Sequence, residues 1–413
     1  MNSKSGKFKV VHLSTFYKGG AGIAACRLHK AMLKEGVDSY IGFVQAGDMV
    51  KHLERAFSVN QLSIKQRLKN TVYRLLYTSK YEKLLNKLLF SIDAENCILP
   101  FSNYNPLDHV IVKSADIIHL HWVCGMIDYL DFFKKCTKPI IWTLHDMYPM
   151  QGLFIYKDDD QKNYLVAKEL DTYVRNLKEI ALHRFTNKLV ITAPSVWLHE
   201  SAKGSKILGL YNNFYIPNCI DFSEFKILDK LDCRKELNLP EDKIILLFVS
   251  ASTANRRKGF DLLIDALQII YGKHKNIYLI ALGKSDRETF TSLPIEFAGE
   301  VNDNIILNKY YSAADAFLLP SREDNLPNVM LEAFACGLPI IGTPVGGVKE
   351  NVIEKNGVMA KDISGQGLAG AINHFMENRQ LFSATEIREY AKTIFSNSKI
   401  VEQFLESYKG LIS

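Results

Sequence analysis

The sequence predicts an α/β protein of two Rossmann-like, doubly wound domains that face each other across a cleft. Short β-rich runs alternate with stretches of helical periodicity in the first half, which is typical of a mainly parallel sheet. The alternation starts again at Lys243–Ser250 (KIILLFVS), a near-continuous apolar strand of the kind that helices cover on both faces. The 413 residues fit about two or three domains of roughly 150 residues each.

The first half begins with an expected strand at Phe8–Thr15, a glycine loop at Lys18–Gly22 and a helix at Ile23–Glu35. A further helix is expected at Met126–Lys135. The other expected strands of this half are Asp38–Val44, Asp116–Trp122, Pro139–Leu144, Leu189–Ala193 and Phe214–Ile216.

In the second half, helices are expected at Phe260–Tyr271 and Val329–Cys336, and the chain from Gly365 onward looks wholly helical. The expected strands that follow Lys243–Ser250 are Asn276–Leu282, Ala316–Leu319 and Leu338–Gly342.

The turn-prone segment Pro217–Asp221 (PNCID) lies between the two halves. We therefore expect domains at residues 1–222 and 223–395, and a C-terminal helix at 396–413 as a candidate to pack back on the first domain. Ligands of open α/β sheets bind beyond the carboxyl ends of the strands, so the cleft between two such sheets is the expected site.

The cysteines favour a reducing compartment. Their number, seven, is odd, and no two are spaced as CxxC, so neither a disulfide framework nor a zinc knuckle fits. The short apolar run at the N-terminus is typical of a first strand rather than a signal peptide, and no stretch approaches the ~20 apolar residues of a membrane span. We expect a cytoplasmic protein, at most peripheral on the inner membrane.

The positive charge is concentrated in one segment. Nine basic and two acidic residues lie between residues 51 and 90, a net charge of +7, against +6 for the whole chain. Because leucines and tyrosines are interleaved with the charge, Lys51–Lys87 is a candidate interfacial helix for an anionic membrane surface. The alternative is a surface helix with a buried leucine face. The confinement of the charge and the absence of a recognition motif argue against nucleic-acid binding.

Two features of the first half point to ligand binding. Gly19, Gly20 and Gly22 follow the first strand, where backbone N–H groups can meet an anion, although a tight turn with close packing explains them equally well. His119 and His121 share one face of a strand, and His145 ends the next strand, where catalytic groups of this architecture lie. Zinc binding by these three histidines lacks any further ligand spacing, and we predict no metal.

The second half contains a stronger motif, PSREDNLPNVMLEAFACGLP, at residues 320–339. Asp324 and Glu332 lie eight positions apart, and such carboxylates accept hydrogen bonds from sugar or ribose hydroxyls. Pro327 suits the first turn of a helix and Gly337 its end. Gly346 and Gly347 follow the next strand, where backbone N–H groups can meet a diphosphate. The alternative is a capped, solvated helix start.

This region resembles the donor site of glycosyltransferase family 4, which comprises retaining enzymes of the GT-B fold. The family pattern of an acidic residue, seven others and a glutamate matches Asp324 and Glu332, with aspartate where glutamate is usual and Glu323 beside it as a substitute. Lys258, within RRKGF, matches the lysine that neutralises the donor diphosphate. The family's partner arginine falls on Ser252, so Arg256 or Arg257 is the candidate to replace it.

The resemblance implies a site without metal or cofactor, in which a nucleotide sugar, UDP- or GDP-linked, is the co-substrate. Glu332 would bind ribose, Asp324 the donor sugar, and Lys258 with an arginine would offset charge on the leaving diphosphate. The implied catalytic residues are His145, Lys258 and Asp324. The implied donor-binding residues are Gly20, Arg256, Arg257, Lys258, Glu323, Asp324, Asn325, Leu326, Pro327, Asn328, Glu332, Gly346 and Gly347. The implied acceptor-binding residues are Gly19, His121 and Asp146.

The stretches LHW and WTLHD resemble family members that build bacterial capsule, exopolysaccharide or O-antigen. The expected acceptor is therefore a glycan or a polyprenyl-diphosphate-linked sugar. Three other functions stay open: a nucleotide-sugar epimerase, a phosphorylase, and a subunit that binds a sugar or nucleotide without catalysis. A phosphorylase needs a far longer chain, and product analysis with and without acceptor separates an epimerase from a transferase.

Overall fold

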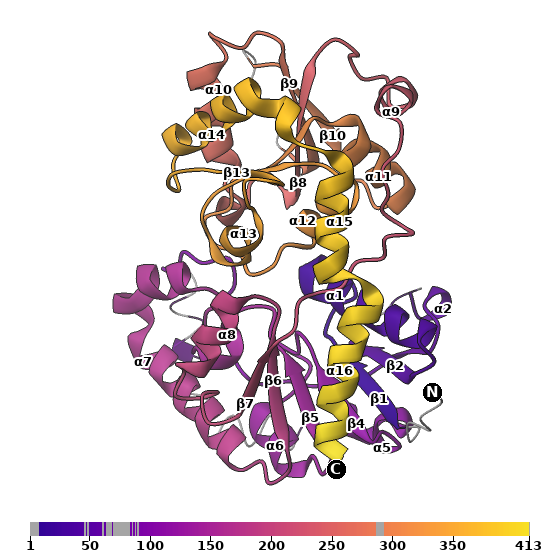
Figure 1. Ribbon diagram of the computed structural model, residues 1–413. Coiled ribbons are helices and arrows are strands. Elements are labelled where there is room, and N and C mark those ends of the chain that lie inside the picture. Colours follow the sequence, from indigo (N-terminus) through magenta and orange to yellow (C-terminus); the bar gives the residue numbers. More distant parts are fainter. Residues whose placement is uncertain are drawn as a thin grey trace. The chain divides into compact units, whose positions relative to one another are not determined.

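A computed structural model of the chain describes residues 8–44, 49–59, 91–285 and 293–412, with isolated positions between 47 and 88. The chain forms two compact units (Figure 1). Unit 1 runs to Pro194 and includes Leu198–Ile216 and Val401–Ser413. Unit 2 comprises Ser195–Trp197 and Pro217–Ile400.

Unit 1 contains a seven-stranded parallel sheet in the order β3-β2-β1-β4-β5-β6-β7. Chain order reverses between β1 and β4, so the carboxyl ends of these two strands flank the switch point where doubly wound sheets bind ligands. The strands are β1 (Lys9–Leu13), β2 (Asp38–Phe43), β3 (Ala56–Ser58), β4 (Ile117–Leu120), β5 (Ile140–Thr143), β6 (Leu189–Ala193) and β7 (Asn212–Tyr215).

The helices of unit 1 include one long element that the sequence did not reveal, α7 (Lys157–His183), which is charged along much of its surface. The others are α1 (Gly19–Lys34), α2 (Met49–His52), α5 (Val110–Lys113), α6 (Tyr129–Lys135) and α8 (Val196–Lys203), of which α8 belongs to unit 1 from Leu198 onward. The last helix of the chain, α16 (Asn397–Ile412), yellow in Figure 1, belongs to unit 1 from Val401 onward. Its Tyr408 is fully buried, and the ring packs edge-on against Phe8, 5.8 Å between centroids.

The expected glycine loop after β1 is the first turn of α1. Gly19 has a φ of 74°, which favours glycine, and the helix starts there, four residues earlier than predicted. A side chain on Gly22 would place its Cβ 2.5 Å from the carbonyl oxygen of Phe16. Gly22 therefore serves close packing between the strand end and the helix.

Unit 2 contains a six-stranded parallel sheet in the order β10-β9-β8-β11-β12-β13, with its switch point between β8 and β11. The strands are β8 (Ile244–Ser252), β9 (Ile277–Lys284), β10 (Ile295–Gly299), β11 (Ala316–Leu319), β12 (Ile340–Gly342) and β13 (Gly357–Met359). The helices are α9 (Lys230–Glu236), α10 (Phe260–Ile270), α11 (Asn304–Ala313), α12 (Asn328–Ala335), α13 (Gly346–Asn351), α14 (Gly365–Asn378) and α15 (Ala384–Phe395).

Alternate residues of β8 enter two separate cores. Ile245 and Leu247 pack with residues of α11, α12 and α15, whereas Leu246 and Phe248 pack with α10 and α14 on the opposite face. Helices thus cover both faces, which explains the continuous apolar run in the sequence. The prediction of two doubly wound α/β domains is confirmed.

Three further observations bear on the sequence-based expectations. All seven cysteines are free, and all but Cys97 are buried. No helix in the described part of the chain combines the length and the apolar character needed to cross a membrane. Most of the basic segment Lys51–Lys87 lies outside the described residues, so its role at a membrane stays a prediction.

Candidate functional site

The carboxyl ends of β8 and β11 bring two cations and a carboxylate together in unit 2. After β8, residues 256–258 form a 3₁₀ turn, and after β11 the acidic loop begins. The Nζ of Lys258 lies 2.5 Å from Oδ2 of Asp324, and Nη1 of Arg257 lies 3.6 Å from Oδ1. We call Arg257, Lys258 and Asp324 the cation–carboxylate cluster. A Cβ on Gly259 would lie 1.9 Å from the carbonyl oxygen of Pro320, so only glycine lets the turn approach the loop this closely.

Asp324 is buried, with 6% of its surface exposed, and also accepts hydrogen bonds from the Ser321 hydroxyl and the Asn325 backbone N–H. Burial alone would raise the pKa of Asp324, but Lys258 and Arg257 outweigh it and hold the pKa below its ordinary value. The carboxylate is therefore charged at neutral pH.

The structure shows where the candidates that the sequence left open lie. Asp324 pairs with Lys258, and the backbone carbonyl of Glu323 accepts from Arg257 Nη1 at 3.1 Å. Arg256 is exposed at the surface of the turn. Sequence reasoning missed Arg322, which donates to the carbonyl of Arg256 and to both carboxylate oxygens of Asp261, and so ties the loop to the turn.

The two glycines after β12 let α13 pack against the acidic loop. A Cβ on Gly346 would lie 1.8 Å from the carbonyl oxygen of Asp324, and one on Gly347 would lie 2.2 Å from that of Asn325. The N–H of Gly347 donates to the Asn325 carbonyl at 2.6 Å. This N–H group is therefore engaged by the protein itself.

The rest of the motif is largely buried. Glu332, in α12, is 4% exposed, and its Oε2 accepts from the hydroxyl of Tyr311 at 2.7 Å. Pro327 precedes α12 with a φ of −65°, and Leu326 and Asn328 are buried beside it. The side-chain oxygen of Asn325 accepts from Ser195, which belongs to the same unit, at 2.6 Å.

Unit 1 holds a row of imidazoles beneath the carboxyl ends of its central strands. Nδ1 of His12, in β1, lies 3.0 Å from Nε2 of His121, and Nδ1 of His121 lies 3.1 Å from Nε2 of His145. We call these three residues the histidine row. Burial lowers the pKa of His145 to about 4 and takes those of His12 and His121 well below the ordinary value. The row is therefore neutral at pH 7.

His119 lies beside the row but bonds elsewhere: its Nδ1 contacts the Tyr408 hydroxyl at 2.6 Å and its Nε2 the Thr143 hydroxyl at 2.7 Å. The nitrogens of His12, His119 and His121 lie within 4.8 Å of one another. The rings of His119 and His121, however, stack with 4.3 Å between centroids and 21° between planes. An imidazole binds a metal in its ring plane, so these stacked rings cannot share one ion without rotating.

The residues expected to bind the acceptor have structural partners in unit 1. His121 is 3% exposed within the histidine row. Asp146 is 6% exposed, and its carboxylate accepts from the Trp122 indole N–H and the Tyr148 backbone N–H. Gly19 and Gly20 form the exposed first turn of α1.

Sequence reasoning also missed Lys178. Its ammonium group is fully buried and donates to the carbonyls of Tyr148, Gln151 and Gly152 at 2.6–3.0 Å. Lys178 thereby fixes the loop that follows His145 and Asp146. A single lysine within a charged helix gives no sequence signal for such a role.

Comparison with known proteins finds a family match within unit 2. Residues 243–378 match the family model described as Glycosyl transferases group 1. These residues form a glycosyl transferases group 1 domain.

Similar proteins agree with this assignment. A putative teichuronic acid biosynthesis glycosyltransferase, TuaC of Bacillus subtilis, is 29% identical over 53% of this chain and 56% of its own length. The matched stretches span between 39% and 67% of the lengths of eight curated relatives.

Solved structures show the fold. Sucrose-phosphate synthase from Thermosynechococcus elongatus superimposes with a TM-score of 0.68 at 19% identity, over 98% of this chain and 99% of that one. Anabaena HepE in complex with UDP-glucose superimposes with a TM-score of 0.65 at 17% identity, over 98% of this chain and 100% of HepE. The fold is GT-B.

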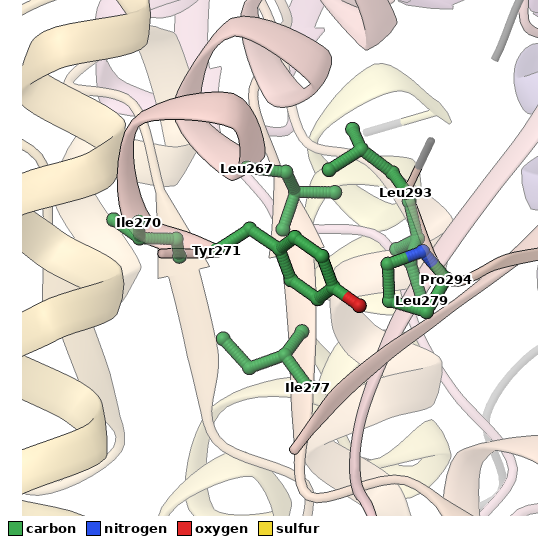
Figure 2. Close-up of a pocket in the computed structure, with 7 residues that line it drawn as sticks. All are labelled: Leu267, Ile270, Tyr271, Ile277, Leu279, Leu293 and Pro294. Atoms are coloured by element: carbon green, nitrogen blue, oxygen red, sulfur yellow. The ribbon is translucent and has the colours of Figure 1, made fainter. Parts of the chain in front are cut away.

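The group 1 domain contains the cation–carboxylate cluster and Glu332, whereas the histidine row lies outside it. The domain also has an apolar depression, lined by Leu267, Ile270, Tyr271, Ile277, Leu279, Leu293 and Pro294 (Figure 2). Its lining comes from the end of α10, the start of β9 and the residues just before β10 (Ile295–Gly299), at the amino edge of the sheet. Without a charged side chain in this lining, the depression does not suit a diphosphate.

Proposed function

We propose that this protein is a glycosyltransferase that moves a sugar from a nucleotide-diphosphate sugar to a hydroxyl of a glycan or lipid-linked oligosaccharide. The observation that carries the proposal is the cation–carboxylate cluster at the carboxyl ends of β8 and β11, beside the switch point of the unit 2 sheet. Ligands of doubly wound sheets bind at such points. The group 1 domain in the same residues supports this activity.

The donor diphosphate is the ligand that this cluster would take. Lys258 and Arg257 supply two positive charges, and the buried Asp324 lies beside both of them. A diphosphate would offer a competing anion, and charge that builds on it as the sugar leaves would be stabilised by Lys258. Glu332, held by Tyr311, would bind the ribose hydroxyls. That HepE was solved with UDP-glucose favours a uridine donor.

The reaction is proposed to retain the anomeric configuration and to need no metal. The acceptor hydroxyl would attack the face that the diphosphate leaves, and the lysine and arginine side chains would do the charge balancing that a divalent cation does elsewhere. Measurement of the product anomer by proton NMR and assays in the presence of a chelator test these two points separately.

The acceptor is proposed to be a growing bacterial surface polysaccharide, in its polyprenyl-diphosphate-linked form at the cytoplasmic membrane face. The name of the teichuronic acid relative supports a polysaccharide product. The charge of Lys51–Lys87 would suit the anionic surface that carries such an acceptor. His145, at the end of β5, is proposed to contact the donor sugar, and Gly19 and Gly20 to lie near the acceptor.

A donor screen tests the proposal. UDP-, GDP-, dTDP- and CMP-sugars are compared by thermal shift and by hydrolysis, since a ligand that binds only the folded state raises the melting temperature. One nucleotide class is expected to stabilise the protein, and Lys258→Met to abolish that shift. Lys273→Met is the matched control, because Lys273 forms an exposed ion pair with Glu377. A shift that survives Lys258→Met would overturn the site, and binding without turnover on any acceptor would indicate a non-catalytic subunit.

A further inference from the structure

The histidine row is built from three strands that are distant in sequence. His12 lies within β1, His121 follows β4 and His145 follows β5, so the row leads from the buried sheet to the strand end where His145 is half-buried. The two nitrogen–nitrogen distances of 3.0 and 3.1 Å are hydrogen-bond distances. Each contact therefore contains one shared proton.

Because burial keeps these rings neutral, each ring carries one N–H group and one acceptor nitrogen. His121 uses both of its nitrogens, one in each contact, so it donates in one and accepts in the other. The two hydrogen bonds must then run in the same direction. Only two arrangements exist: protons point from His12 toward His145, or from His145 toward His12.

The end of the row at His12 selects between these arrangements. His12 is fully buried, and its Nε2 has no hydrogen-bond partner among the described residues. If the protons pointed toward His12, Nε2 would carry a buried N–H group without an acceptor, which folded proteins rarely tolerate. If they point toward His145, the His12 proton is on Nδ1 and is used in the bond to His121.

We propose that His12 and His121 are positioning residues that hold His145 as the tautomer protonated on Nδ1, with Nε2 accepting from His121. The proton of His145 is then on Nδ1, so this nitrogen acts as a hydrogen-bond donor and not as an acceptor. The tautomer follows from unit 1 alone. Its use, donation to a hydroxyl of the donor sugar, rests on the proposed function.

Nitrogen-15 NMR of the ligand-free protein tests the tautomer directly, because protonated and unprotonated ring nitrogens have distinct chemical shifts. His145 is expected to show a protonated Nδ1 and an unprotonated Nε2 at pH 7. The opposite pattern at His145 in the wild-type protein would overturn the proposal, and this measurement needs no variant apart from those used for assignment.

Two substitutions at one position sharpen the test. The amide nitrogen of His12→Asn takes roughly the place of ring Nδ1 and keeps the donor, whereas His12→Leu removes it. The leucine variant is expected to lose the single His145 tautomer and the asparagine variant to keep it. His29→Asn is the control, because His29 is equally buried but bonds to Ser39 and the Glu54 carbonyl. A His145 tautomer that is unchanged in His12→Leu would also overturn the proposal.

A turnover assay connects the tautomer to the reaction. With the donor that the screen identifies, His12→Leu is expected to lower kcat about ten- to hundredfold, by analogy with the loss of an orienting partner of a metal-binding histidine. The KM for the donor should stay within about twofold, and His12→Asn should restore most of the kcat. An expected tautomer without turnover of any nucleotide sugar leaves the tautomer intact and defeats the proposed function instead.

Discussion

The cation–carboxylate cluster of unit 2 and the histidine row of unit 1 both approach the carboxyl edge of a parallel sheet, yet they treat charge in opposite ways. In unit 2, two cations hold a buried carboxylate in its charged form. In unit 1, burial keeps three imidazoles neutral. A cluster of opposite charges can exchange its internal anion for a ligand's anion, whereas a neutral row can only fix the direction of hydrogen bonds. From this difference we expect unit 2 to bind an anion and unit 1 to orient hydrogen bonds.

The largest expected effect is a difference in acid sensitivity. Burial lowers the pKa of His29 and of His145 to about 4, whereas an unfolded histidine titrates near about 6.5. As pH falls from about 6.5 to about 4, the unfolded chain binds protons that the folded chain excludes, which costs up to about 1.4 kcal/mol per pH unit for each such histidine. Asp324, whose pKa is lowered, keeps its contribution until the pH falls below the unfolded value of about 3.9.

Unit 1 should therefore lose stability at a pH where the cluster of unit 2 is still intact. Hydrogen exchange of the β1 and β5 peptides of unit 1, corrected for intrinsic rates, measures the first effect. Hydrogen exchange of β8 and β11 peptides, corrected for intrinsic rates, measures the second. A free energy of unfolding for unit 1 that stays constant between pH 7 and 5 would contradict the comparison.

The second effect concerns the charge of the cluster. Lys258→Met removes the cation nearest to Asp324, and the barrier to transfer should rise by about 3 kcal/mol, a hundred- to thousandfold loss of kcat, as when one oriented donor to a developing anion is removed. Steady-state kinetics with the identified donor checks this value against the Lys273→Met control. A loss below about fivefold would mean that Lys258 balances Asp324 and does not act on the diphosphate.

The same comparison shows what the sequence could reveal. The cluster lies in contiguous motifs, so Lys258 and Asp324 could be predicted from spacing and resemblance. The histidine row joins residues from three strands, and no spacing in the sequence signals that His12 meets His121. The central strands could be predicted because they are continuous apolar runs. The edge strands β3, β10 and β13 escaped prediction, because none of them is a continuous apolar run like those of the central strands.

Glu332 illustrates a different limit. The motif predicted its place in a helix, which α12 confirms. It did not predict that α12 would be buried on nearly all sides. Glu332 is therefore only 4% exposed, and its carboxylate accepts a hydrogen bond from Tyr311. In a helix that is buried on nearly all sides, the packing of other elements decides where a polar side chain points. For Glu332 that element is α11, which carries Tyr311, and the motif contains no information about it.

A third prediction separates Asp324 from its neighbour. Asp324→Asn leaves Lys258 and Arg257 near a neutral amide, and the free energy of unfolding should fall by about 3 kcal/mol, since removal of one partner from a buried ion pair leaves charge uncompensated. Glu323→Gln should lower it by less than Asp324→Asn does, because the variant keeps the backbone carbonyl of Glu323 that accepts from Arg257. Urea denaturation at pH 7 measures both. Equal losses of unfolding free energy in the two variants would show that the ion pairs of Asp324 with Lys258 and Arg257 do not stabilise unit 2 as proposed.

The smallest effect concerns the carboxylate proposed for ribose. Tyr311→Phe removes the hydroxyl that donates to Glu332, and both residues are buried, so the protein should lose about 2 kcal/mol of unfolding free energy. Tyr278→Phe is the matched control, because Tyr278 donates to Glu296 at 2.9 Å in a partly exposed pair, where water replaces the lost partner and the loss should stay below about 0.5 kcal/mol. If Glu332 binds ribose, Tyr311→Phe should also weaken donor binding by several-fold while Tyr278→Phe leaves it unchanged. A stability loss with unaltered donor affinity would assign Glu332 to the core of unit 2 and leave the binding of the nucleotide to the cation–carboxylate cluster alone.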